Sequence, residues 1–111
     1  MKVSLAQALA RLPAAPTSMY PQGAPFVTMM ASGTMSVEVY APKGEDLQQP
    51  HMQDELYFVQ RGTGEIVING QRFDAAAGDA FFVAAGVVHR FENFSDDFVT
   101  WVVFYGKQGG E

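Results

Sequence analysis

The stretch that decides the fold of this chain is residues 47–64, L-Q-Q-P-H-M-Q-D-E-L-Y-F-V-Q-R-G-T-G. Polar side chains gather before the apolar run Leu56–Val59, and a glycine, Gly62, follows shortly after it. Successive side chains of an extended strand point to opposite faces, so Gln49, His51 and Glu55 share one face if the chain is extended there. Glu55 would then stand at the mouth of a buried strand, where an unpaired charge is costly. A metal ion or a hydrogen-bonding partner must therefore compensate the buried charge of Glu55.

A second histidine opens another predicted strand. His89 follows the turn residues Ala85-Gly86, and it is the only histidine besides His51. The chain has no cysteine, so thiolate ligands are excluded. Two imidazoles and the Glu55 carboxylate match the set of two histidines and one carboxylate that is typical of non-haem Fe(II) sites, and zinc is chemically possible too. The alternative is a polar pocket that is hydrogen-bonded without a metal.

The rest of the chain reads as a succession of short strands. Apolar or alternating runs are each closed by turn residues, and Asn69-Gly70 indicates a two-residue hairpin turn. Many short strands at this spacing predict an all-β sandwich or barrel. The expected strands are Phe26–Met30, Thr34–Tyr40, Glu55–Gln60, Glu65–Asn69, Gln71–Phe73, Ala80–Val83, Val88–Phe94 and Phe98–Tyr105.

One short helix is expected near the amino terminus. Apolar residues at helical spacing lie between a capping-box pattern, Ser4 with Gln7, and a terminating Pro13. The organisation that we expect is a single domain with an N-terminal helix and proline-rich connector (1–25), a barrel (26–105) and a loose polar tail (106–111).

Composition narrows the possible functions. The net charge is −5 and the seven Lys and Arg are scattered, so nucleic acid is not an expected partner. No apolar run approaches the ~18 residues of a membrane span. Residues 1–16 lack the continuous apolar core of a signal peptide, so we expect a cytoplasmic location without a membrane partner. There is no P-loop, dinucleotide fingerprint or nucleophile elbow.

Two motifs resemble those of the cupins, over roughly residues 34–105. The first has glutamine where the family has its first histidine, and its upstream glycine is one residue closer than in the family: Gln49-x-His51-x3-Glu55-x6-Gly62. The second has alanine where the family usually has proline: Gly78-x5-Ala84-x-Gly86-x2-His89-x3-Asn93. The resemblance implies an antiparallel cupin β-barrel of the jelly-roll type.

The resemblance also implies a metal site inside the barrel. Carried over by position, the ligands of a divalent ion (Fe, Mn, Ni or Zn) would be Gln49, His51, Glu55 and His89. An amide oxygen is a weaker donor than imidazole, so Gln49 either ligates the ion or hydrogen-bonds a bound water or ligand.

Four further residues are candidates for lining the pocket. Glu38 either faces solvent or points inward as an acid–base group, while Tyr57, Phe91 and Trp101 either line the pocket or pack in the core. The family hosts many chemistries, so whether the chain is an enzyme stays open. We expect a small metal-dependent dioxygenase or isomerase acting on a small organic substrate, or else a non-catalytic module that binds or senses a small molecule. A homodimer is expected, with the aromatic-rich last strand as one candidate surface.

Overall fold

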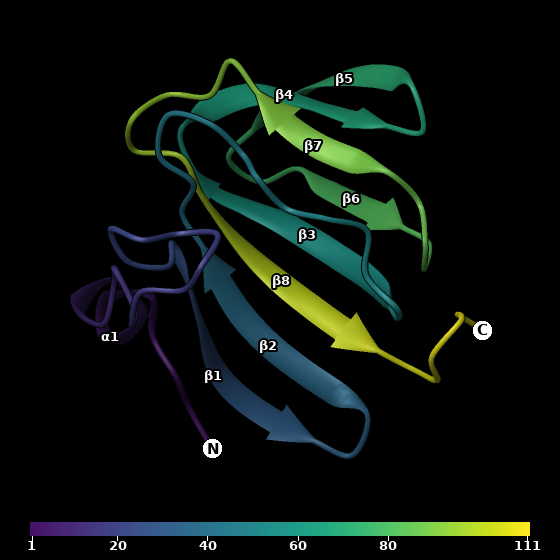
Figure 1. Cartoon of the computed structure of the whole chain (residues 1–111), viewed down its shortest axis with the longest axis horizontal. Coiled ribbons are helices and arrows are strands. Elements are labelled where there is room, and N and C mark those ends of the chain that lie inside the picture. Colours follow the sequence, from purple (N-terminus) through teal and green to yellow (C-terminus); the bar gives the residue numbers. More distant parts are fainter.

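Eight antiparallel strands in two sheets form the barrel (Figure 1). The computed structural model describes residues 1–111. The strands are β1 Phe26–Ser32, β2 Met35–Tyr40, β3 Asp54–Arg61, β4 Thr63–Ile68, β5 Gln71–Ala76, β6 Ala80–Val83, β7 His89–Glu92 and β8 Val99–Tyr105. The larger sheet has the order β1-β2-β8-β3-β6 and the smaller sheet the order β5-β4-β7.

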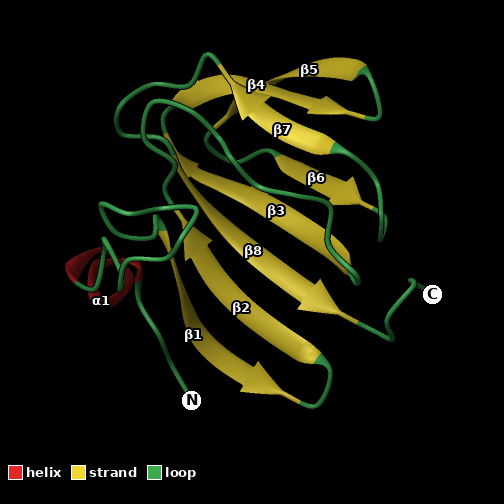
Figure 2. Cartoon of the chain, in the orientation of Figure 1, coloured by secondary structure: helices red, strands yellow, loops and turns green.

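The all-β class predicted from the sequence is confirmed, and every expected strand is present (Figure 2). Asn69 and Gly70 join β4 to β5 with φ values of 49° and 82°, as a two-residue hairpin turn requires. Strand ends differ from expectation by at most three residues. Gly64 lies within β4, where a Cβ would stand only 2.8 Å from the Cβ atom of Phe94. Here tertiary packing, not turn chemistry, requires the glycine.

The main core lies between the two sheets. Tyr57, Val102 and Phe104 of the larger sheet pack with Ile66 and Phe91 of the smaller sheet in one hydrophobic cluster. Strand alternation decides which side chains enter this core, and the same alternation turns Glu55 inward. The polar site is therefore built on the inner face of a packed barrel.

The helix α1, Leu5–Ala10, covers part of the outer face of the larger sheet (Figure 1). The predicted capping box is present, with reciprocal hydrogen bonds between Ser4 and Gln7. Ala8 packs with Val39 and Val99 in a second apolar cluster. At six residues, α1 is far from the length needed to cross a membrane, and there is no other helix.

The carboxyl-terminal residues are tied down rather than loose. Gly109 N–H donates to the Met52 carbonyl at 2.7 Å, and Glu111 N–H donates to the Asp54 carboxylate at 3.1 Å. These bonds hold the tail against the segment that enters β3. A polar, glycine-rich composition indicated mobility, and the backbone hydrogen bonds outweigh it.

The last strand, β8, lies in the middle of the larger sheet. It pairs with β2 on one side and with β3 on the other, so it offers no free edge to a second copy. The edges of that sheet are β1 and β6. A dimer built by strand pairing would have to use one of those edges.

Candidate metal centre

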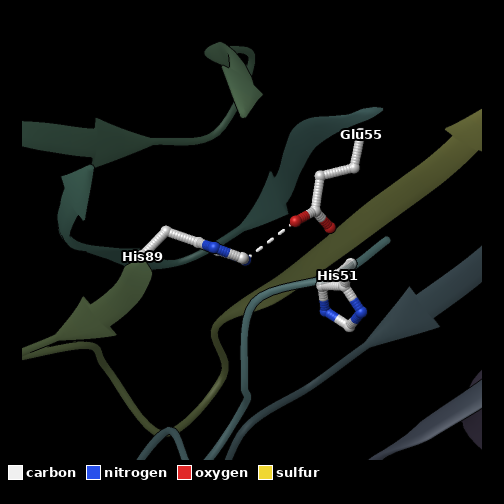
Figure 3. Close-up of side chains that lie close together, drawn as sticks. All are labelled: His51, Glu55 and His89. Atoms are coloured by element: carbon white, nitrogen blue, oxygen red, sulfur yellow. Dashed lines mark ion pairs between the residues drawn. The ribbon is translucent and has the colours of Figure 1, made fainter. Parts of the chain in front are cut away.

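Three predicted ligands converge although they come from two separate stretches of sequence. Glu55 is the second residue of β3, His89 is the first residue of β7, and His51 lies in the loop before β3. One potential ligand atom from each of these residues lies within 4.8 Å of the other two. Figure 3 shows the three side chains grouped at this point. The starts of β3 and β7, where the sequence predicted ligands, therefore lie next to each other in space.

The loops that carry the two histidines are bonded to each other. Gly86 N–H donates to the His51 carbonyl oxygen at 2.8 Å, and Ala85 N–H donates to Asp54 Oδ1 at 2.9 Å. Asp54, the acceptor of the second bond, is buried next to Glu55 in the sequence. The turn that precedes β7 thus fixes the two imidazoles relative to one another.

Glu55 and His89 form a buried pair. Glu55 Oε1 lies 2.8 Å from His89 Nε2, and the two side chains are 1% and 0% exposed. The other carboxylate oxygen, Oε2 of Glu55, is buried and has no hydrogen-bond partner. A buried oxygen left without a partner is costly, and a bound cation is one way to compensate it.

The proton arrangement on His89 follows from its second ring nitrogen. Nδ1 lies 2.9 Å from the Val87 carbonyl oxygen, which can only accept a hydrogen bond, so Nδ1 carries a proton. In the neutral ring, Nε2 then presents a lone pair toward Glu55. That arrangement suits a cation between them, or else requires a second proton on the ring.

The two histidines differ in their proton affinity. Burial alone would lower the pKa of His89, but its hydrogen bond and charge interaction with Glu55 outweigh burial and raise the pKa above its usual value. For His51, burial dominates and lowers the pKa, although Glu55 opposes this. In the metal-free protein His89 is therefore the ring that takes up a proton first.

The amide that reaches the cluster belongs to Gln48. Its Oε1 lies 3.1 Å from His89 Nε2 and accepts a hydrogen bond of 2.6 Å from the Tyr57 hydroxyl. The Tyr57 oxygen is itself 3.0 Å from His89 Nε2. Gln49, which the motif indicated, has an exposed side chain at the mouth of the adjoining cavity.

Asp46 holds the Gln48 amide in one orientation. This carboxylate is 1% exposed and accepts from Gln48 Nε2 at 2.6 Å and from the Gln48 N–H at 3.0 Å. It also accepts from the Tyr40 hydroxyl and from the Phe91 N–H. Because Asp46 engages the NH2 group, only the amide oxygen of Gln48 faces His89.

A cavity of about 450 Å³ opens beside the cluster, within the range of ligand pockets. Glu38 and Tyr57 line it, as does His51. Phe91 and Trp101 do not. Phe91 is 1% exposed in the core between the sheets, and Trp101 packs on the outer cluster beneath α1.

Sequence reasoning missed three residues of this site. Gln48 and Asp46 lie in a segment without strand or helix, where no periodicity assigns a side chain to a face. Tyr20 lines the cavity from the proline-rich connector and pairs edge-on with Phe26, with ring centroids 6.1 Å apart. The one available signal was that an aspartate and an amide stood just before the motif.

Comparison with known sequences assigns the chain to a family. The family described as Cupin domain matches residues 36–105, which is more than half of the chain. The chain belongs to the cupin family. The predicted resemblance is therefore confirmed, and so is the expected barrel. An uncharacterised protein of Streptomyces coelicolor is 37% identical to this cupin over 81 residues, covering 71% of this chain and 77% of that protein.

Solved structures share the fold of this cupin. KdgF from a Halomonas species superposes with a TM-score of 0.65 at 15% identity, covering 75% of this chain and 78% of that one. A cupin superfamily protein of Desulfitobacterium hafniense gives 0.62 at 18% identity, with coverage of 74% and 76%. The DMSP lyase DddQ of Ruegeria pomeroyi gives 0.64 at 21% identity, with coverage of 74% and 46%. At these identities the likeness concerns the fold alone.

Cupins commonly bind a metal ion, and the donors of this chain fit one. Two imidazoles and a carboxylate converge, and one carboxylate oxygen is buried without a partner. Such a set of nitrogen and oxygen donors suits Fe, Mn, Ni or Zn. The chemistry of the site therefore agrees with the family.

Proposed function

We propose that this cupin binds a divalent metal ion through His51, Glu55 and His89 and acts on a small organic molecule in the adjoining cavity. The reaction class that we propose is that of a metal-dependent dioxygenase or isomerase. The observation that supports it most is the buried, unpartnered Oε2 of Glu55, whose carboxylate clusters with two imidazoles beside a cavity of about 450 Å³.

A bound ion would supply Lewis-acid chemistry or, as iron, redox chemistry. The chain's own residues prepare the place for the substrate. Val102 and Phe104 give the cavity an apolar wall beside the cluster. The Tyr57 hydroxyl lies within hydrogen-bond reach of His89 and can donate a proton toward a ligand when Gln48 releases it.

Gln48 takes the role that the motif indicated for Gln49. Its oxygen lies at 3.1 Å from the ligating nitrogen of His89, held there by Asp46. We propose that it is the neutral oxygen that completes the site, either on the ion or on a water bound to it. Gln49, exposed at the mouth, would contact the entering ligand instead.

Elemental analysis tests the metal proposal. Protein prepared without chelators or metal-affinity resin should carry close to one divalent ion per chain. His51→Ala should remove it, whereas Gln53→Ala should keep it, because Gln53 bonds the backbone at Thr34 and Gly106 instead of the cluster. Metal-free protein from metal-replete cells, with no uptake on titration, would contradict the proposal.

A second function is favoured by one observation. Nε2 of His89 has Glu55, Tyr57 and Gln48 within 3.1 Å, so a doubly protonated His89 can donate to Glu55 without a metal. The cupin would then be a non-catalytic module that binds or senses a small molecule. Ligand binding that is unchanged between metal-free and metal-loaded protein would favour this second function.

The homodimer remains a separate proposal. Sedimentation velocity on the full chain measures it directly, and a purely monomeric protein at micromolar concentration would contradict it. If the dimer forms by strand pairing, the free edges β1 and β6 are the strands of the larger sheet to alter.

A further inference from the structure

Glu38 faces the cavity from β2, two strands away from β3, which carries Glu55 of the metal cluster. The side chains of Ser36, Glu38 and Tyr40 alternate inward along β2 and line the cavity. In the sheet register, Glu38 lies opposite Val102, and Val102 lies opposite Tyr57. Two strand spacings place the backbones of Glu38 and Tyr57 about 10 Å apart. A small molecule can therefore reach the cluster at one end and Glu38 at the other.

No cation neutralises Glu38 within the chain. The ion pairs of the structure join Arg72 to Glu65 and Glu92 and join His89 to Glu55. Glu38 accepts only a hydrogen bond of 3.3 Å from the Thr28 hydroxyl. Burial raises the pKa of Glu38; the Thr28 bond opposes this, and the charge of Glu55 adds to it. A half-buried carboxylate without a counter-ion gains most when a ligand brings one.

The remaining cavity wall is suited to a positive charge. None of the seven Lys and Arg of the chain lines it. The wall has three aromatic rings besides those of Tyr57 and Phe104, and such rings attract a cation over their faces: Tyr20, Phe26 and Tyr40. An anionic group at this end would meet the carboxylate with no positive side chain to offset it.

We infer that the cavity takes a small organic cation, an amine or quaternary ammonium, with the charged group held by Glu38 and the surrounding rings. An oxygen of the same molecule would face the cluster of His51, Glu55 and His89. The orientation of that oxygen rests on the proposed function, whereas the preference for positive charge depends only on the cavity.

Three molecules of nearly the same shape test the inference. Choline is cationic, 3,3-dimethyl-1-butanol is its neutral counterpart, and 3,3-dimethylbutanoate is anionic. Isothermal titration of the full-length protein, as purified and after removal of metal, should give choline an affinity about tenfold above that of the alcohol. The anion should bind more weakly than the alcohol in metal-free protein, where no metal ion attracts its carboxylate.

Glu38→Gln keeps the shape of the side chain and removes its charge. In this variant choline should lose its tenfold advantage, while the affinity for the alcohol should stay within about twofold. Glu45→Gln is the matched control, because Glu45 is exposed on a loop outside this cavity and should leave all three affinities unchanged. Thermal unfolding of each variant checks that it folds. If Glu38→Gln does not fold, the affinities of the three molecules for the protein with its native sequence still test the inference.

Four outcomes would each overturn the inference. They are equal affinities for the three molecules, a preference for the anion in metal-free protein, a choline preference that survives Glu38→Gln, and no binding of any of the three. Its failure is separable from that of the proposed function. Metal content is measured on the same samples, so a metal-loaded protein without charge preference rejects only the inference. A metal-free protein that prefers choline rejects only the metal proposal.

Discussion

The side-chain oxygen of Gln48 lies 3.1 Å from Nε2 of His89, although 41 positions separate the two residues in the sequence. This contact places the amide of the site one residue before the position that the cupin motif indicates. It also depends on Asp46, which holds the NH2 group of the same amide. Substitutions at Gln48 and at Gln49 therefore separate the roles of these two residues.

Gln48→Ala should weaken metal binding by about tenfold, since a neighbour that orients or completes a metal site has effects of that size. Gln49→Ala is the matched control, and its affinity for Zn²⁺ or Mn²⁺ should stay within about twofold. Calorimetric titration of both chelator-treated variants measures the difference. The opposite ranking would show that the motif position, and not the geometry, decides the fourth contact.

Acidification should weaken metal binding. The pKa of His89 is raised in the metal-free protein, chiefly because Glu55 outweighs the effect of burial. The ion and the proton compete for Nε2, so the affinity should fall as the pH decreases through that raised pKa. Titrations in buffers of different ionisation heat, at a pH below this pKa, should reveal about one proton released per ion. An affinity that is flat between pH 5 and 8 would contradict this competition.

Glu55→Gln should reverse the direction of the His89 pKa shift. With the carboxylate charge gone, burial is the dominant influence, so the pKa of His89 should lie below its usual value instead of above it. NMR titration of the two histidine side chains in metal-free protein measures this, with His51→Ala used to assign the signals. A His89 pKa that stays raised in the variant would mean that another group provides the stabilising charge.

Asp46→Ala should destabilise the barrel by about 3 kcal/mol, because the donors of Tyr40, Gln48 and Phe91 would be left buried without an acceptor. The matched control is Asp96→Ala, whose exposed side chain should matter by no more than about 0.5 kcal/mol. Urea unfolding of both variants gives the comparison. A loss below about 1 kcal/mol for Asp46→Ala would show that water replaces the lost acceptor.

The sequence predicted the barrel well because alternation and turn chemistry are local. The spacing of apolar residues within each strand predicts that strand, and the pair Asn69-Gly70 predicts the hairpin turn that it forms. The convergence of His51, Glu55 and His89 was also accessible, since the motif spacing places them at strand mouths.

The contact between Gln48 and His89 was not predictable by the same reasoning. Assigning Gln49 to the face of Glu55 required an extended chain between them, but β3 begins only at Asp54. The segment from Asp46 to Gln53 has no strand, so parity does not apply to it. What orients Gln48 is Asp46, itself bonded to the backbone of Phe91, 45 positions away. No local pattern contains such a long-range bond.

The bond between Glu111 N–H and the Asp54 carboxylate has a practical consequence for any preparation of this protein. A hexahistidine tag attached after Glu111 would begin next to Asp54, which immediately precedes Glu55 in the sequence. Its imidazoles would compete with His51 and His89 for the proposed ion, and it would begin close to Gln108, which lines the cavity. The amino terminus lies at a distance from the carboxyl end in Figure 1, so purification tags belong there.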